Sequence, residues 1–111
     1  MITLYLRYTF DPNKISDVKA YAEAELRPIT ESGGKILGYF LPTDFAGATN
    51  HAYGLIDFPS LAEYEVYRAK LAEHPLHKEY AAALQRSGAL MSIERSIIQR
   101  VEEPNRERGQ S

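Results

Sequence analysis

The first ten residues place the strongest constraint on how this chain can fold. Apolar side chains recur there at every second position, namely Ile2, Leu4, Leu6, Tyr8 and Phe10. A period of two predicts a β-strand whose two faces meet different surroundings. The alternate face carries Tyr5 and Arg7, an aromatic ring and a guanidinium, which suit a semi-polar covered surface better than bulk water. We therefore expect a central strand with helices on one face and a different covering on the other.

Length and composition indicate one ordinary globular domain. The chain has 111 residues, of which 44% are hydrophobic and 25% are charged, and these values are typical of a soluble protein with a modest core. Apolar periodicity ends near residue 101. We therefore expect a single domain over residues 1–101 and a charged tail over residues 102–111.

Charge and residue types exclude several classes of function. The formal net charge of −2 provides no basic field, so neither nucleic acid nor an anionic membrane is expected as a partner. The absence of cysteine excludes disulfides, thiolate nucleophiles and cysteine-based metal sites. No apolar run reaches the roughly 18 residues of a membrane span, and no basic segment precedes an apolar one at the N-terminus. We expect a cytoplasmic protein.

A helix is predicted over residues 14–32. Apolar residues recur there at spacings of three and four, at Ile15, Val18, Ala22, Leu26 and Ile29. Asn13 is placed to cap the start of this helix, and the pair Gly33-Gly34 ends it.

A hairpin of two strands is predicted next, over residues 35–42 and 50–58. In the first of these strands, simple alternation places Leu37 and Tyr39 on the same face. Both faces of this strand are largely apolar, so both are expected to be covered.

The second half of the chain predicts a broken helix and a fourth strand. Ser60 and Glu63 have the spacing of a capping box, in which a hydroxyl and a carboxylate satisfy backbone amides at a helix start. His74-Pro75 breaks this helix, and a second helical piece follows over residues 76–87. A strand is expected over residues 89–101.

Crossover and hairpin rules arrange these elements as a ferredoxin-like βαββαβ fold of the α+β class. They produce an antiparallel four-stranded sheet in the order 4-1-3-2, with both helices on one face. The other face would expose an apolar patch, formed by Tyr5, Leu37, Tyr39, Tyr53 and Ile98. Because such patches rarely face water in a monomer, we expect a homodimer that packs sheet against sheet and closes a dimeric α/β barrel.

Several short motifs, taken in order, resemble the NIPSNAP family within the wider group of dimeric α/β barrels. They are Tyr8-x-Phe10-x-Pro12-x-Lys14, Leu26-Arg27-Pro28, Gly33-Gly34-Lys35-Ile36-Leu37-Gly38, Phe58-x-Ser60-Leu61-x-Glu63 and Arg68-x-x-Leu71-x-x-x-Pro75-x-His77. The resemblance covers roughly residues 2–100. It implies the fold and the dimer more than any chemistry, because the family has no generally established catalytic mechanism.

The first functional hypothesis is a homodimeric protein of unknown activity that binds a small apolar or aromatic molecule between sheet and helices. Its candidate pocket residues are Tyr5, Arg7, Tyr8, Tyr39, His51 and Tyr53. Which face of the first strand lines the cavity stays open at this point. Strict alternation favours Tyr5 and Arg7, whereas the register of the family favours Leu4, Leu6 and Tyr8.

The second hypothesis is a cofactorless enzyme of the monooxygenase or dehydratase kind found in related dimeric barrels. His51 would move a proton near neutral pH, and Arg7 would bind a carboxylate or enolate oxygen. Glu94 is a weaker candidate, as a carboxylate paired with Arg7, because only one of the neighbours Glu94 and Arg95 can point into a cavity. The structural alternative is that Arg7 reaches the sheet edge, His51 ends a strand in solvent, and Glu94 is an edge-strand charge.

The third hypothesis is a protein-interaction module that works through the loop around Phe45 or through the charged tail. An aromatic ring at a loop tip either contacts a partner or folds back on its own domain. We favour the second outcome for Phe45.

No cofactor and no metal are expected. His74 and His77 straddle Pro75, and a metal site would need a third ligand at a suitable spacing. We expect these two histidines at a corner between helices. The pair Gly33-Gly34 follows a helix instead of preceding one, so it ends that helix and does not cradle a phosphate.

Overall fold

Eight elements follow one another in the computed structural model, which describes residues 1–104. They are β1 (Ile2–Phe10), the 3₁₀ turn η1 (Pro12–Lys14), α1 (Ile15–Glu31), β2 (Lys35–Phe40), β3 (His51–Phe58), α2 (Leu61–Glu73), α3 (Pro75–Ser87) and β4 (Leu90–Ile98). The predicted order of strands and helices is confirmed, and the second helix is divided at His74-Pro75. Most of the predicted tail, residues 105–111, lies outside the described residues.

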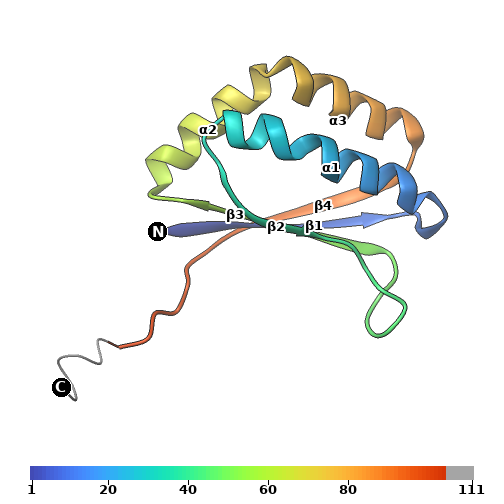
Figure 1. The fold of residues 1–111 in the computed structure, drawn as a ribbon, viewed down its shortest axis with the longest axis horizontal. Helices are drawn as coiled ribbons and strands as arrows, with labels where there is room; N and C mark the ends of the chain where they lie inside the picture. Colours follow the sequence, from blue (N-terminus) through green and yellow to red (C-terminus); the bar gives the residue numbers. More distant parts are fainter. Residues whose placement is uncertain (105–111) are drawn as a thin grey trace.

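β1 lies inside one antiparallel four-stranded sheet, whose order is β2-β3-β1-β4. Leu6 of β1, for example, is paired with Gly54 of β3 on one side and with Arg95 of β4 on the other. All three α-helices cover the same face of the sheet, and no helix within residues 1–104 lies against the other face (Figure 1). The fold is therefore the ferredoxin-like α+β arrangement that the sequence predicts.

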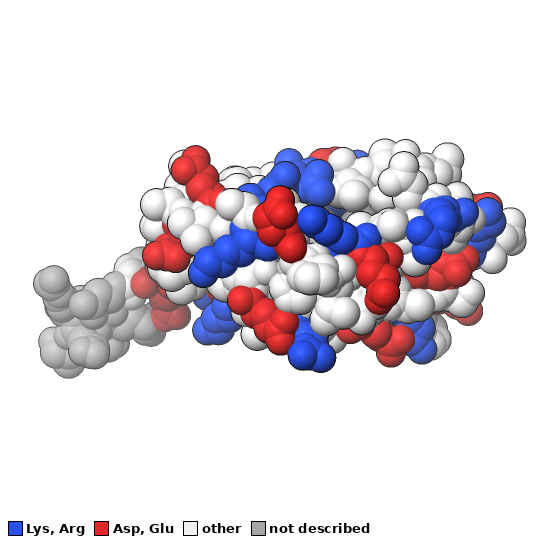
Figure 2. Space-filling view, turned by 90° about the horizontal axis from the view of Figure 1, so that it is seen from above, with Lys and Arg blue, Asp and Glu red and all other residues white. Residues whose placement is uncertain are grey.

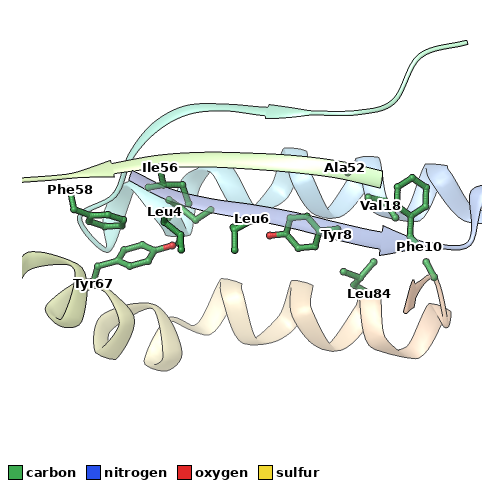
Figure 3. Packing of buried hydrophobic residues seen from close by; sticks show 12 residues of the cluster. Leu4, Leu6, Tyr8, Phe10, Val18, Ala52, Ile56, Phe58, Tyr67 and Leu84 are labelled. Carbon is green, nitrogen blue, oxygen red and sulfur yellow. The ribbon is translucent and has the colours of Figure 1, made fainter. Parts of the chain in front are cut away.

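The hydrophobic core lies between the sheet and the helices. Leu4, Leu6, Tyr8 and Phe10 are buried and point from β1 toward the helical layer (Figure 3). The helices contribute the buried side chains Val18, Ile29, Tyr67 and Leu84 to the same cluster. Burial of side chains of this size stabilises a fold by roughly 1.5–3 kcal/mol each before conformational entropy is subtracted. The alternation in the first ten residues thus selects the core face of β1 correctly.

α1 begins differently from the prediction. Asn13 does not cap it; instead the backbone N–H of Asn13 donates to the Asp11 carboxylate at 3.0 Å, at the start of the 3₁₀ turn. The capping position of α1 belongs to Lys14, whose side chain makes no capping bond there. The reason is local. The Asp11 carboxylate caps the backbone amide of Asn13, so a 3₁₀ turn precedes the α-helix.

α1 also buries a different line of residues from the one that apolar spacing predicts. Glu25 is only 1% exposed, whereas Leu26 is 42% exposed and Ile15 also lies at the surface. The buried positions 18, 22, 25 and 29 still keep the spacing of one helix face. The rotation of the helix about its axis determines whether position 25 or position 26 is buried. The prediction of a buried Leu26 is wrong.

β2 contains an irregularity that changes which side chains share a face. Its pairing with β3 shifts between Ile36 and Gly38, so that Ile36 is paired with Ile56 and Tyr39 with Gly54. An extra residue in a strand moves every later side chain to the opposite face. Tyr39 therefore lies on the helical side, and its prediction among the residues of the uncovered face is wrong.

The loop between β2 and β3 projects on the side of the sheet away from the helices (Figure 1). It begins at residue 41 because β2 ends at Phe40, two residues earlier than predicted. The Phe45 ring is 94% exposed, so the prediction that it folds back on the domain is wrong. Its backbone amide donates to the Thr43 hydroxyl at 3.3 Å.

The side of the sheet opposite the helices, defined here as the open face by Tyr5, Arg7, Tyr53, Leu55 and Ile98, mixes aromatic, apolar and charged side chains. Ile98, the last residue of β4, is 45% exposed. The strand predicted to residue 101 therefore stops three residues earlier. At the same end of the sheet, the buried Asp57 carboxylate accepts hydrogen bonds from Thr3 at 2.5 Å and Arg100 at 3.3 Å.

The helical surface carries charges of both signs. Figure 2 shows lysines and arginines interspersed with aspartates and glutamates over this face. Such a surface lacks the single-sign stripe that attracts nucleic acid. Within residues 1–104, no helix has the length and apolar character needed to cross a membrane.

Candidate functional site

A cavity of about 110 Å³ lies between the sheet and the helices. Its lining comes from β1, β2 and β4 and from all three α-helices. The lining residues are Leu4, Leu6, Tyr8, Tyr21, Glu25, Ile29, Tyr39, Tyr67, Arg68, Leu71, Ala72, His77 and Arg95. An apolar cavity of about 150 Å³ in another protein holds benzene. The space inside this fold therefore approaches the size of a single ring.

Glu25 and His77 form a buried pair at the wall of this cavity. Oε1 of Glu25 is in hydrogen-bond contact with Nδ1 of His77, which stands in the first turn of α3 just after Pro75. The second oxygen of Glu25, Oε2, is buried and has no hydrogen-bond partner among the described residues. Burying a carboxylate oxygen without a partner is costly. This oxygen can therefore accept a hydrogen bond from a polar group of a ligand.

Four tyrosines line the same space, namely Tyr8, Tyr21, Tyr39 and Tyr67. The hydroxyls of Tyr8 and Tyr39 are 3.2 Å apart, and the rings of Tyr8 and Tyr21 meet edge to face with centroids 6.1 Å apart. Burial raises the pKa of Tyr8, of Tyr21 and of Tyr39, and the negative charge of Glu25 adds to the rise of the pKa at Tyr8 and Tyr21. These phenols are therefore protonated at neutral pH and available as hydrogen-bond donors.

A second hollow connects this region with the surface. A groove of about 370 Å³ runs between α3 and β4 and shares Tyr21, His77 and Arg95 with the cavity. Arg68 and Arg95 line the cavity while remaining exposed to solvent. The two guanidiniums thus mark the rim, where they favour a ligand that carries negative charge or develops it.

The structure brings two of the six predicted pocket residues to the cavity. Tyr8 and Tyr39 line it, and the wall formed by β1 is the face of Leu4, Leu6 and Tyr8. This is the face that the family register favours over strict alternation. Of the neighbours Glu94 and Arg95, Arg95 is the one that lines the cavity.

The remaining predicted residues lie together on the open face. Arg7 donates to Glu94 at 2.8 Å, and both side chains are substantially exposed, so solvent screens this ion pair. Nδ1 of His51 lies 3.2 Å from the Thr9 hydroxyl. The rings of Tyr5 and Tyr53 have centroids 6.3 Å apart. The sheet separates this group from the cavity.

Sequence reasoning missed the pair Glu25 and His77. The available signal for Glu25 was its position three residues after Ala22 and four before Ile29, on the buried line of α1. For His77 the signal was its place two residues after the Pro75 break, where the helix turns inward toward α1. Sequence reasoning also assigned no role to Tyr21, which lines both hollows.

His74 and His77, on either side of Pro75, contact different partners. His74 Nε2 lies 2.7 Å from Glu31, and His74 Nδ1 accepts from the backbone N–H of Leu76 at 3.2 Å. His77 instead meets Glu25. Within the described part of the chain, no group of three histidines, aspartates or glutamates is arranged to hold a metal ion.

Comparison with known proteins agrees with this fold. The NIPSNAP family model matches residues 5–102. A NIPSNAP family protein with unknown function from Agrobacterium tumefaciens has a TM-score of 0.80 and 19% identity, over 94% of this chain and 92% of that chain. An uncharacterized NIPSNAP domain protein from Burkholderia xenovorans has a TM-score of 0.77 and 17% identity, over 91% of this chain and 95% of that chain.

A more distant structural neighbour is SnoaB, a cofactor-independent oxygenase from Streptomyces nogalater. Its TM-score is 0.62 and its identity 12%, over 94% of this chain and 96% of that chain. Likeness at this level of identity concerns the fold alone. No curated protein matches the sequence.

Proposed function

The chain belongs to the NIPSNAP family, and from that premise we propose that it is a homodimeric protein that binds a small aromatic molecule between its sheet and its helices. The cavity beneath β1 carries this proposal. It approaches the size of one ring, Leu4 and Leu6 supply apolar contact, and Oε2 of Glu25 is a buried acceptor with no partner among the described residues. Sites for small molecules typically combine apolar walls with a few convergent polar groups.

A thermal-shift experiment tests the binding. Benzoate, phenol and hydroquinone are single-ring probes, and a ligand present at a hundred times its dissociation constant stabilises the folded protein by about 2.7 kcal/mol. We expect at least one of them to raise the melting temperature. Leu6→Phe should abolish this rise, because the added ring occupies the cavity into which Leu6 projects.

Leu61→Phe is the matched control, since Leu61 is more than half exposed at the start of α2 and remote from the cavity. It should respond to the probes as the wild type does. Binding in the cavity is refuted if none of the probes stabilises the wild type, or if a folded Leu6→Phe variant keeps the full response.

The open face supports the proposal of a homodimer. Tyr5, Tyr53 and Leu55 occupy its centre and are only partly covered within one subunit, while Ile98 is 45% exposed at its margin. Aromatic and apolar side chains left partly exposed on one face are characteristic of a protein–protein contact, and a twofold axis lets the same surface cover itself. A second copy packed sheet against sheet would complete a barrel.

Light scattering measures this directly. The wild type should have twice the subunit mass of 12.6 kDa at micromolar concentration. Leu55→Glu should restore the mass of one subunit, because it places an unpaired carboxylate in the middle of the contact. Val66→Glu, which adds the same charge at an exposed position of α2, should remain dimeric. A wild type with the mass of a single subunit would rule out the dimer.

An enzyme is the second candidate, and the observation that favours it is the buried pair of Glu25 and His77 at the cavity wall. A carboxylate and an imidazole in contact are groups that transfer protons near neutral pH. The candidates from sequence reasoning, His51 and Arg7, stand on the open face, where a partner subunit would cover them.

A further inference from the structure

The cavity holds a base and hydrogen-bond donors on different walls. Glu25 and His77 come from α1 and α3, whereas Tyr8 and Tyr39 come from β1 and β2, which β3 separates in the sheet. Leu4 and Leu6 line the same cavity from β1. The same cavity is therefore lined by a proton acceptor and by a pair of hydrogen-bond donors.

Glu25 is suited to accept a proton from a bound molecule. With the proton of the pair on His77, the Nδ1–H of His77 donates to Oε1 of Glu25, which leaves Oε2 as the free acceptor. His77 also lines the groove between α3 and β4. The imidazole therefore has a route by which protons can be exchanged with solvent.

Tyr8 and Tyr39 are suited to stabilise negative charge on oxygen. Their hydroxyls are 3.2 Å apart, and burial keeps the pKa of each above its ordinary value, so they donate without losing their own protons. Fixed donors in a space shielded from water stabilise a developing oxyanion more strongly than water does. Arg95 at the rim adds positive charge.

We propose that the cavity catalyses proton transfer on a ring-sized ketone, with Glu25 as the base and the hydroxyls of Tyr8 and Tyr39 as donors to the enolate oxygen. The C–H bond next to the carbonyl breaks, and its proton goes to Oε2 of Glu25. The electron pair of that bond forms a C=C bond, and the carbonyl π pair moves to oxygen. Return of a proton to carbon restores the ketone, so the step needs no oxidant and no other reactant.

This inference rests on the proposed function, because the ketone must occupy the same cavity as the aromatic ligand. Phenol is a planar mimic of the enol, so its binding reports on the cavity independently of catalysis. Cyclohexanone is the substrate probe, since it has one ring and exchangeable hydrogens beside its carbonyl.

The test follows loss of the cyclohexanone α-proton signal by NMR in deuterium oxide. The wild type should accelerate this loss over buffer. Glu25→Gln keeps the size of the side chain and should lower the exchange rate by about 10²-fold or more. Tyr8→Phe removes one donor without removing the base and should lower it by about 10²-fold. Phenol binding is measured on the wild type alone, because both substitutions alter groups that line the cavity.

Glu79→Gln is the matched control, because this carboxylate lies exposed on α3, the helix that carries His77. It should exchange cyclohexanone at the wild-type rate. If phenol binds the wild type but cyclohexanone exchange is no faster than in buffer, the proton-transfer role is wrong and the binding function stands. If phenol does not bind, both are wrong. Should Glu25→Gln fail to fold, an unchanged rate in Tyr8→Phe would still overturn the assignment of the donors.

Discussion

The burial of Glu25 is a feature of a single residue that sequence reasoning could not predict. Hydrophobicity selects Leu26 for the buried line of α1, because a carboxylate is rarely buried unless it is paired. The structure reverses this choice, leaving Leu26 at the surface and enclosing Glu25 beside His77. The partner lies 52 positions away, beyond the break at Pro75, so no local pattern could indicate the pair. Tyr8, in contrast, was among the predicted pocket candidates, and the structure places it at the cavity.

The buried tyrosines predict how stability depends on pH. Burial raises the pKa of Tyr8, Tyr21, Tyr39 and Tyr67 above the ordinary value of 10.0. The folded protein therefore binds these protons more tightly than the unfolded chain. Their contribution to stability is fully present below pH 10.0 and is lost as the pH rises above it. Urea unfolding, monitored together with tyrosinate absorbance, should show these four phenols ionising only as the protein unfolds.

Tyr39→Phe sharpens this prediction. It should lose the hydrogen bond to Tyr8, which costs about 1 kcal/mol at neutral pH. It should also show a weaker fall of stability above pH 10.0, because one raised pKa is gone. Ionisation of all the tyrosines near pH 10.0 in a protein that remains folded would contradict the account.

At the scale of elements, the sequence was sufficient for the order, the type and most ends of the strands and helices. The serine of the predicted capping box is an example: the Ser60 hydroxyl accepts from the backbone N–H of Glu63 at 3.2 Å. The faces of β2 could not be predicted, because its register shift between Ile36 and Gly38 depends on pairing with β3 and not on a local pattern. That shift is what carries Tyr39 to the cavity.

Gly54 on β3 makes room for the Tyr39 ring. A Cβ at Gly54 would lie 2.9 Å from Cε1 of Tyr39, closer than carbon atoms approach in proteins. Gly54→Ala should therefore displace the ring, break its bond to Tyr8 and destabilise the fold by roughly 1–3 kcal/mol. Chemical denaturation measures this cost.

A double-mutant cycle assigns the cost of Gly54→Ala to Tyr39. In a Tyr39→Ala background the ring is absent, so Gly54→Ala should cost much less. The explanation fails if Gly54→Ala destabilises both backgrounds equally, since the steric conflict would then lie elsewhere.

In the whole molecule, the two faces of the sheet have different surroundings. Its helical face encloses the cavity, and its open face presents Tyr5, Tyr53 and Leu55. The sequence predicted both faces but could not decide which of them lines the cavity, because Arg7 and Tyr8 on adjacent positions of β1 made each face chemically plausible. Helix packing against Leu4, Leu6 and Tyr8 resolves this. We therefore expect a ligand to bind on the helical face of the sheet.

Methyl NMR during a titration with phenol tests this claim most directly, because the two faces of the sheet carry separate methyl groups. The methyl resonances of Leu4, Leu6 and Ile29, which line the cavity, should shift with a common saturation curve. Those of Leu55 and Ile98 on the open face should stay unchanged. Shifts confined to Leu55 and Ile98 would place the ligand on the other side of the sheet and contradict the account.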